Sequence, residues 1–146
     1  MENQTNEIET LGTTNTCPVA VITRDGKVLM GLRHYTPDKW KTISVWTIPG
    51  GRCDDGEKLE KTLRREISEE TGIENLEIEE YLGTVPGAKE GDVVPMFRCK
   101  TDDEPTLLEP EKFSEWKWFS PQEVPENFIN PQALVVIRDS LESKEN

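Results

Sequence analysis

Apolar residues occur in short blocks along the middle of the chain, separated by polar or glycine-rich stretches. Two apolar runs between Cys17 and Arg33 flank Asp25-Gly26, a pair that favours a tight turn between antiparallel strands. The stretch 34–44 is polar and contains Pro37, so we predict a loop there. Further strand-like blocks follow at 45–48, 76–85, 92–100 and 115–120. The pattern predicts a hairpin followed by several short strands.

Helical spacing appears first between Glu57 and Thr71, with Gly72 as a stop. Asp54 or Asp55 is suited to begin this helix, with Glu57 in its first turn. A second amphipathic helix is predicted over residues 130–143, with Pro131 at its start. Antiparallel hairpins combined with two helices indicate a layered α+β domain.

The length of 146 residues suits one domain. Residues 1–15 and 142–146 are polar and aperiodic, so we expect frayed or disordered tails around a single domain at 16–141. No apolar run approaches the ~20 residues that span a membrane, and no signal peptide is recognisable. These features favour a cytoplasmic protein without a membrane partner.

Acidic residues outnumber basic ones by 29 to 17, giving a formal charge of −12. This excess works against binding a nucleic-acid polymer through its backbone. If the ligand is anionic, a divalent cation is the obvious attracting group. The three cysteines are widely spaced without a CxxC pair, which argues against a disulfide framework or a zinc site.

The first helix gathers three carboxylates in an unusual place. On a wheel of about 100° per residue, the apolar stripe lies at roughly 20° to 100° from Glu66 and consists of Leu59, Leu63 and Ile67. Glu70 falls inside this stripe and Glu66 at its edge, while Glu69 lies one step to the side. Because an unpaired buried carboxylate is costly, we expect a hard cation such as Mg²⁺ or Mn²⁺ there. The alternative is a charge run on an ordinary exposed helix.

The spacing of these residues is that of a known motif: Gly51, five residues, Glu57, seven residues, Arg65-Glu66-Ile67, one residue, Glu69-Glu70, one residue, Gly72-Ile73. It resembles the complete signature of the Nudix hydrolases. The resemblance covers about residues 16 to 141 and implies an α/β/α sandwich, with a mixed β-sheet between helices. It also implies metal-dependent hydrolysis of a nucleoside diphosphate linked to another moiety.

In that family the glutamates of the helix bind divalent ions, so the resemblance assigns this role to Glu66, Glu69 and Glu70. The carbonyl of Gly51 often joins them, and Glu57 contributes directly or through water. Arg65 belongs to the same catalytic group because it orients the glutamates by ion pairing. Either Glu66 or Glu69 is favoured as the base, although some members recruit an acid from a distant loop.

Three residues are candidates for substrate binding. Arg33 ends the hairpin, where family members often carry a basic residue near the phosphates; a surface arginine is the alternative. Trp116 and Trp118 alternate with Lys117, so they share one side of a strand and form a candidate stacking wall for a base; core packing is the alternative. His34 is the only histidine and lacks an acidic partner in sequence, so we expect an exposed or substrate-edge role.

The marks of several substrate classes are absent from the sequence, which favours an ordinary, deoxy or oxidised nucleoside triphosphate, cleaved to a monophosphate and pyrophosphate. A nucleotide sugar or a dinucleotide is the alternative within the same chemistry. A non-catalytic nucleotide-binding module is the alternative of another class, but such modules usually lose glutamates that this chain retains. Family members are often dimers, so the resemblance also allows a homodimer.

Overall fold

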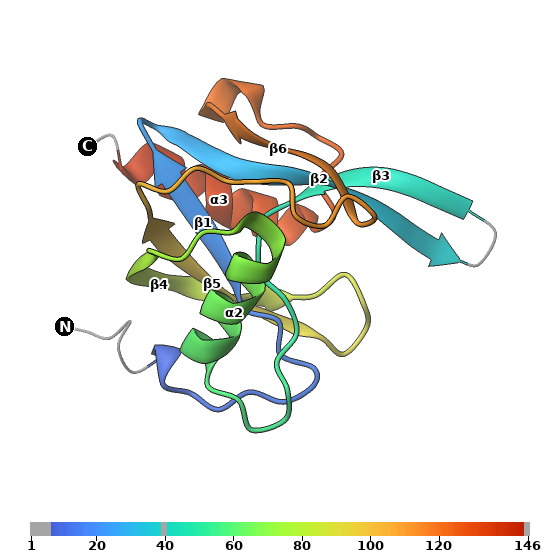
Figure 1. Ribbon diagram of the computed structural model, residues 1–146, viewed down its shortest axis with the longest axis vertical. Helices are drawn as coiled ribbons and strands as arrows, with labels where there is room; N and C mark the ends of the chain where they lie inside the picture. The colour runs from blue at the N-terminus through green and yellow to red at the C-terminus, as the bar shows by residue number, and fades with distance from the viewer. Residues whose placement is uncertain (1–6, 39–40, 145–146) are drawn as a thin grey trace.

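The computed structural model describes residues 7–38 and 41–144 (Figure 1). The strands are β1 (Val19–Arg24), β2 (Lys27–Asp38), β3 (Lys41–Thr47), β4 (Glu77–Pro86), β5 (Val93–Lys100) and β6 (Phe113–Phe119). The helices are α2 (Leu59–Thr71), the 3-10 turn η1 (Pro121–Glu123) and α3 (Pro131–Lys144). Within this described part, no helix is both long and apolar enough to cross a membrane.

The strands form one mixed sheet in the order β3-β2-β1-β5-β4, with β6 paired to β2. β1 runs parallel to β5, and the other pairs are antiparallel. The predicted turn between β1 and β2 is confirmed: Asp25 and Gly26 have φ of 53° and 77°, as a tight hairpin turn requires. The sheet lies between α2 in front and α3 behind (Figure 1), so the predicted α/β/α sandwich is confirmed.

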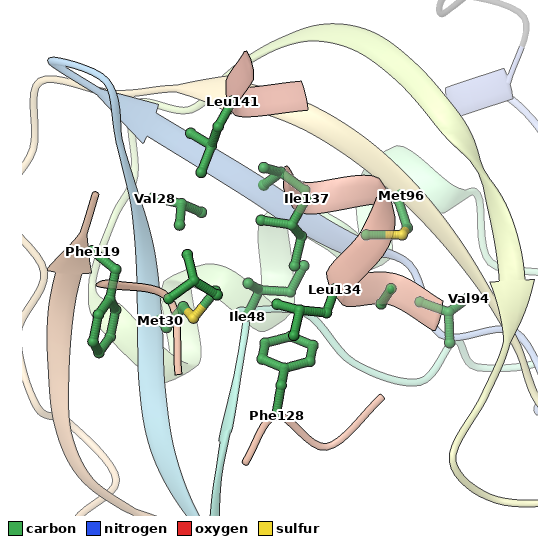
Figure 2. Close-up of a cluster of buried hydrophobic side chains, with 13 residues drawn as sticks. Val28, Met30, Ile48, Val94, Met96, Phe119, Phe128, Leu134, Ile137 and Leu141 are labelled. Carbon is green, nitrogen blue, oxygen red and sulfur yellow. The ribbon is translucent and has the colours of Figure 1, made fainter. Parts of the chain in front are cut away.

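Successive residues of the central strands point to opposite sides of the sheet and fill two cores. Behind it, one core cluster combines residues of the strands, of α3 and of the connecting segments (Figure 2): Val28, Met30, Ile48, Val94, Met96, Phe119, Phe128, Leu134, Ile137 and Leu141. In front, α2 supplies the predicted apolar stripe to a second core: Leu59, Leu63 and Ile67 pack with Ala20, Ile22, Leu29 and Phe97. The sheet is therefore covered on both faces.

The predicted loop at 34–44 is wrong. β2 continues to Asp38 and β3 begins at Lys41, which makes a long hairpin. Among the described residues, the β2–β6 pairing extends along β2 only to Arg33, and the β2–β3 register shifts between Tyr35 and Asp38, so this part of β2 can include a proline. Trp40, which the sequence placed in the loop, lies outside the described residues.

Helix α2 begins at Leu59 with Lys58 as N-cap, two residues later than predicted, and Asp54 and Asp55 do not start it. It ends as predicted at Gly72, whose φ is 77°. The delayed start has a tertiary cause, since the backbone before the helix pairs with residues 10–12. The hydrogen bonds run from the amide of Gly12 to the carbonyl of Glu57, and from Leu59 to Thr10. Residues 7–15 therefore depart from the predicted frayed tail.

Candidate active site

A cavity of ≈ 660 Å³ lies at one end of the sheet. Its walls come from the segment 47–52 after β3, from the acidic side of α2, from β2 and the start of β6, from the β4–β5 turn, and from the segment leading into α3. Polar and apolar groups line it together. Glu66 and Glu70 are the two carboxylates of the helix that reach it.

Glu70 is the most deeply placed of the helix acids, with 6% of its surface exposed. In the described part of the chain, its carboxylate accepts one hydrogen bond, from the amide of Gly50 at 3.2 Å, and has no ion pair. Burial raises the pKa of Glu70 to about 8, the Gly50 amide opposes this, and the carboxylates of Glu66 and Glu109 raise it further. A cation beside Glu70 would relieve this cost.

Glu66 lies against the backbone of Gly51. A Cβ built on Gly51 would lie 2.3 Å from Oε1 of Glu66, so only glycine permits this approach. Burial raises the pKa of Glu66, and the neighbouring guanidinium of Arg65 opposes that rise. The contact places the carboxylate and this stretch of main chain together at the cavity wall.

Arg65 holds two of the acids from outside the cavity. Its guanidinium donates to Oε2 and Oε1 of Glu57 at 3.1 and 2.9 Å and to Oε2 of Glu66 at 2.9 Å. The bonds from Arg65 to Glu57, with smaller contributions from the Asp54 amide and the Thr62 hydroxyl, lower the pKa of Glu57 to about 2. Both carboxylate oxygens of Glu57 are thus paired with Arg65, and the same guanidinium orients the carboxylate of Glu66.

Glu69 is placed differently from the other acids. Its side chain is 52% exposed, lies 3.7 Å from Arg65, and is not among the described residues that line the cavity. Among the residues that the structure describes, no three acidic, histidine or cysteine side chains already surround one point. The donor set nevertheless fits a hard divalent cation, because Glu70 is buried without an ion pair to any residue that the structure describes, and Glu66 lines the same cavity against Gly51.

Two basic side chains flank the acids on the β2 side of the cavity. Arg33, a predicted substrate-binding residue, lines it, and its buried Nε has no hydrogen-bond partner among the described residues. Lys112 precedes β6 and lies 3.8 Å from Glu109. Glu109, whose buried Oε1 is also unpartnered within the described chain, is close enough to affect Glu70. It is an acid from a distant loop that no local motif indicated.

On the opposite wall, Arg52 forms a two-pronged ion pair with Asp92, at 2.9 and 2.8 Å. Asp92 is nearly buried and also accepts from the side-chain amide of Asn15, and the arginine lowers its pKa. This pair ties the β4–β5 turn to the segment after β3. Lys89, in that turn, also lines the cavity.

The predicted stacking wall lies elsewhere. Neither Trp116 nor Trp118 is among the described residues that line the cavity, and both pack against the core under α2. Trp116 covers Gly31, where a Cβ would lie 2.7 Å from the ring, and Trp118 carries the guanidinium of Arg24 at 4.7 Å from its centroid. The packing alternative is therefore the one that the contacts favour.

His34 sits away from the cavity as well. Its two ring nitrogens lie 3.2 and 3.1 Å from the hydroxyls of Ser44 and Ser114 on the neighbouring strands. The aromatic rings that do border the cavity are Phe113 and Phe128. Phe113 begins β6 and Phe128 lies in the segment before α3, and no local motif distinguished either residue. All three cysteines are free.

Comparison with known proteins matches most of the chain to one family. A family model described as NUDIX domain matches residues 14–139. The RNA pyrophosphohydrolase of Novosphingobium aromaticivorans is 30% identical over 132 residues, covering 76% of this chain and 80% of that protein. The CTP pyrophosphohydrolase of Escherichia coli is 29% identical over 104 residues, covering 71% and 74%. A MutT-like protein of Streptomyces ambofaciens is 34% identical over 116 residues, covering 78% and 68%.

Solved structures show the same architecture. A MutT NUDIX hydrolase from Burkholderia pseudomallei superposes with a TM-score of 0.68 at 26% identity, covering 86% of this chain and 97% of that one. A NUDIX hydrolase from Nitrosomonas europaea reaches a TM-score of 0.73 at 21% identity, with 93% and 74% coverage, and supports the fold alone.

Proposed function

Because this chain belongs to the NUDIX family and is a hydrolase of that family, we propose that it is a Mg²⁺- or Mn²⁺-dependent pyrophosphohydrolase that cleaves a nucleoside triphosphate to a monophosphate and pyrophosphate. The observation that carries the proposal is Glu70, a buried carboxylate that forms no ion pair with any described residue, beside Glu66 at a cavity that also holds basic side chains. Such a site suits a divalent ion together with a polyanion.

Each residue of the motif has a task in this proposal. Glu66, Glu70 and the carbonyl of Gly51 would hold the ion, and Glu69 would join them from the helix edge. A bound divalent ion supplies charge neutralisation at the anhydride oxygens and makes water a better nucleophile. Arg65 keeps Glu66 turned toward the cavity through its hydrogen bond at 2.9 Å. The base is Glu66 or Glu69, as the family resemblance suggests.

The nature of the substrate is the finer part of the proposal. Relatives carry the names RNA pyrophosphohydrolase and CTP pyrophosphohydrolase, and both names describe attack on a polyphosphate. The cavity combines apolar wall residues, including Phe113 and Phe128, with the cations Arg33 and Lys112. A base or ribose suits the first set and phosphates the second. Activity in the cytoplasm and a homodimeric assembly remain predictions.

A substrate panel tests the proposal directly. Ordinary and oxidised nucleoside triphosphates, a nucleotide sugar, ADP-ribose, a dinucleoside polyphosphate and a 5′-triphosphorylated RNA are each incubated with Mg²⁺ or with EDTA, and the products are identified. We expect pyrophosphate release from at least one triphosphate, abolished by EDTA. Cleavage confined to the sugar or the dinucleotide would overturn the triphosphate assignment. Binding of a nucleotide without any cleavage would favour the non-catalytic module instead.

A further inference from the structure

Of the residues that the structure describes, four basic side chains line the cavity, and they come from two different walls. Arg33 and Lys112 belong to one wall, because Arg33 pairs with Phe113 in the β2–β6 register and the amide of His34 donates to the carbonyl of Lys112. Arg52 and Lys89 belong to the other, where Asp92 connects them. The strand order separates these walls, since β2 and β5 lie on opposite sides of β1.

The first wall is the one beside the acids. The charge of Lys112 lowers the pKa of Glu66, and that of Arg33 lowers the pKa of Glu70, although burial outweighs both effects. These two cations are therefore close to where an anhydride would be cleaved. Cations on the second wall lie nearer to Asp92 and Cys17.

Among the described residues of the second wall, Lys89 is the cation whose side chain has no partner. Arg52 is neutralised by its two-pronged pair with Asp92, whereas the carbonyl of Lys89 accepts from the amide of Asp92 and its ammonium forms no ion pair or hydrogen bond within the described chain. Its exposed ammonium sits on a short turn, Gly87 to Gly91, between β4 and β5. A backbone hydrogen bond closes the turn, because the amide of Gly87 donates to the carbonyl of Asp92 at 2.8 Å. A flexible side chain on an anchored turn is suited to meet an anionic ligand.

We propose that Lys89 binds a phosphate group beyond the cleaved anhydride and makes the enzyme selective for chains of three or more phosphates. The inference rests on the proposed function and deepens it. A triphosphate has negative charge on both sides of the bond between its first and second phosphates. It can therefore meet the cations of both walls at once. A nucleotide sugar presents an uncharged group at the far end, which gains nothing from an ammonium ion.

Binding of a non-hydrolysable α,β-methylene nucleoside triphosphate, measured by calorimetry, tests this without turnover. We expect Lys89→Ala to weaken binding about 5-fold, and Lys89→Arg to restore most of it, because the interaction is a charge-assisted contact at a partly solvated site. Affinity for the matching nucleotide sugar should change less than about 2-fold. In turnover, KM for the triphosphate should rise by a similar factor with kcat nearly unchanged.

Lys61→Ala is the matched control, because it removes the same charge from an exposed position on α2 outside the cavity lining. If both lysine variants weaken the triphosphate analogue equally, the effect is general electrostatics and the inference is overturned. Equal losses for triphosphate and sugar would overturn it too. Should the wild type cleave nothing, the proposed function fails, while the binding comparison still decides the role of Lys89.

Discussion

The two helices cover opposite faces of the same sheet, yet their buried faces differ in kind. Beneath α3 the core includes Ile137 and Leu141, and the buried polar residue of this helix is Ser140, which carries no charge. Beneath α2, the apolar stripe is interrupted by Glu70, with Thr62 and Glu57 buried beside it. Burying ionisable groups costs stability unless they gain partners. Within the described residues, the buried face of α3 thus carries no ionisable group, whereas α2 gives up part of its packing surface to a carboxylate that lines the cavity.

The strongest test of this contrast is Glu66→Gln, which keeps the side-chain size but removes the charge. If α2 carries the chemistry, kcat/KM should fall by about 100-fold or more, because the residue would be both a ligand and a candidate base. The melting temperature should hardly change. Glu60→Gln, on the first turn of the same helix and paired only with Arg64 in the described structure, is the control and should retain activity. Full activity in Glu66→Gln would break the contrast.

The opposite result is expected for α3. Ile137 is fully buried, so Ile137→Ala should reduce the free energy of unfolding by about 3 to 4 kcal/mol. The folded fraction should keep its kcat, since no atom of Ile137 lines the cavity. Denaturant unfolding and active-site titration measure the two quantities. Val135→Ala, at a position 58% exposed on the same helix, should cost less than about 0.5 kcal/mol. A loss of kcat in folded Ile137→Ala would contradict the division of roles.

In metal-free protein, the buried acid of α2, Glu70, should make the free energy of unfolding depend on pH. Its folded pKa, about 8, lies above the unfolded value. Folded protein therefore holds one more proton between these values, and stability falls as pH rises through this window. The free energy of unfolding of the wild type should fall by on the order of 3 kcal/mol between pH 5 and 8. In Glu70→Gln this fall should be absent. Unfolding in EDTA across this range, wild type against variant, measures it. Parallel curves would show that Glu70 does not titrate as described.

The smallest effect is expected at Trp116, whose ring packs on the core under α2 and is not among the described residues that line the cavity. Trp116→Ala should lower the free energy of unfolding by about 2 kcal/mol, because the ring covers Gly31 and packs on Phe113. KM for the best nucleotide should stay within about 2-fold. Phe113 touches both the ring and the cavity, so a larger rise in KM together with unchanged stability would revive the stacking role.

Much of the fold was predictable because its signals are local. Asp25-Gly26 defines a turn through positive φ, and Gly72 ends α2 for the same reason. Helical spacing also placed Glu70 inside the apolar stripe and Glu69 outside it, as their burial and exposure show. These features depend on residues within one or two turns of each other, so a single sequence contains the information.

The remainder depended on contacts between distant parts of the chain. Pairing with residues 10–12 delayed the start of α2, and β2 could continue through Pro37 because its described pairing with β6 extends only to Arg33. Alternation showed that Trp116 and Trp118 share a side of β6, but only the pairing with β2 decided that this side meets the core under α2.

The sequence by itself determined the motif, the two helices and the acids that approach the buried face, because spacing along one helix fixes direction. Tertiary structure alone decided which cations line the cavity that those acids reach. Arg52 meets Asp92 across 40 residues, and Lys89 reaches the cavity through the turn that this pair anchors. A cavity is formed by surfaces from several elements, and their approach depends on the packing of the whole sheet, which no local pattern encodes.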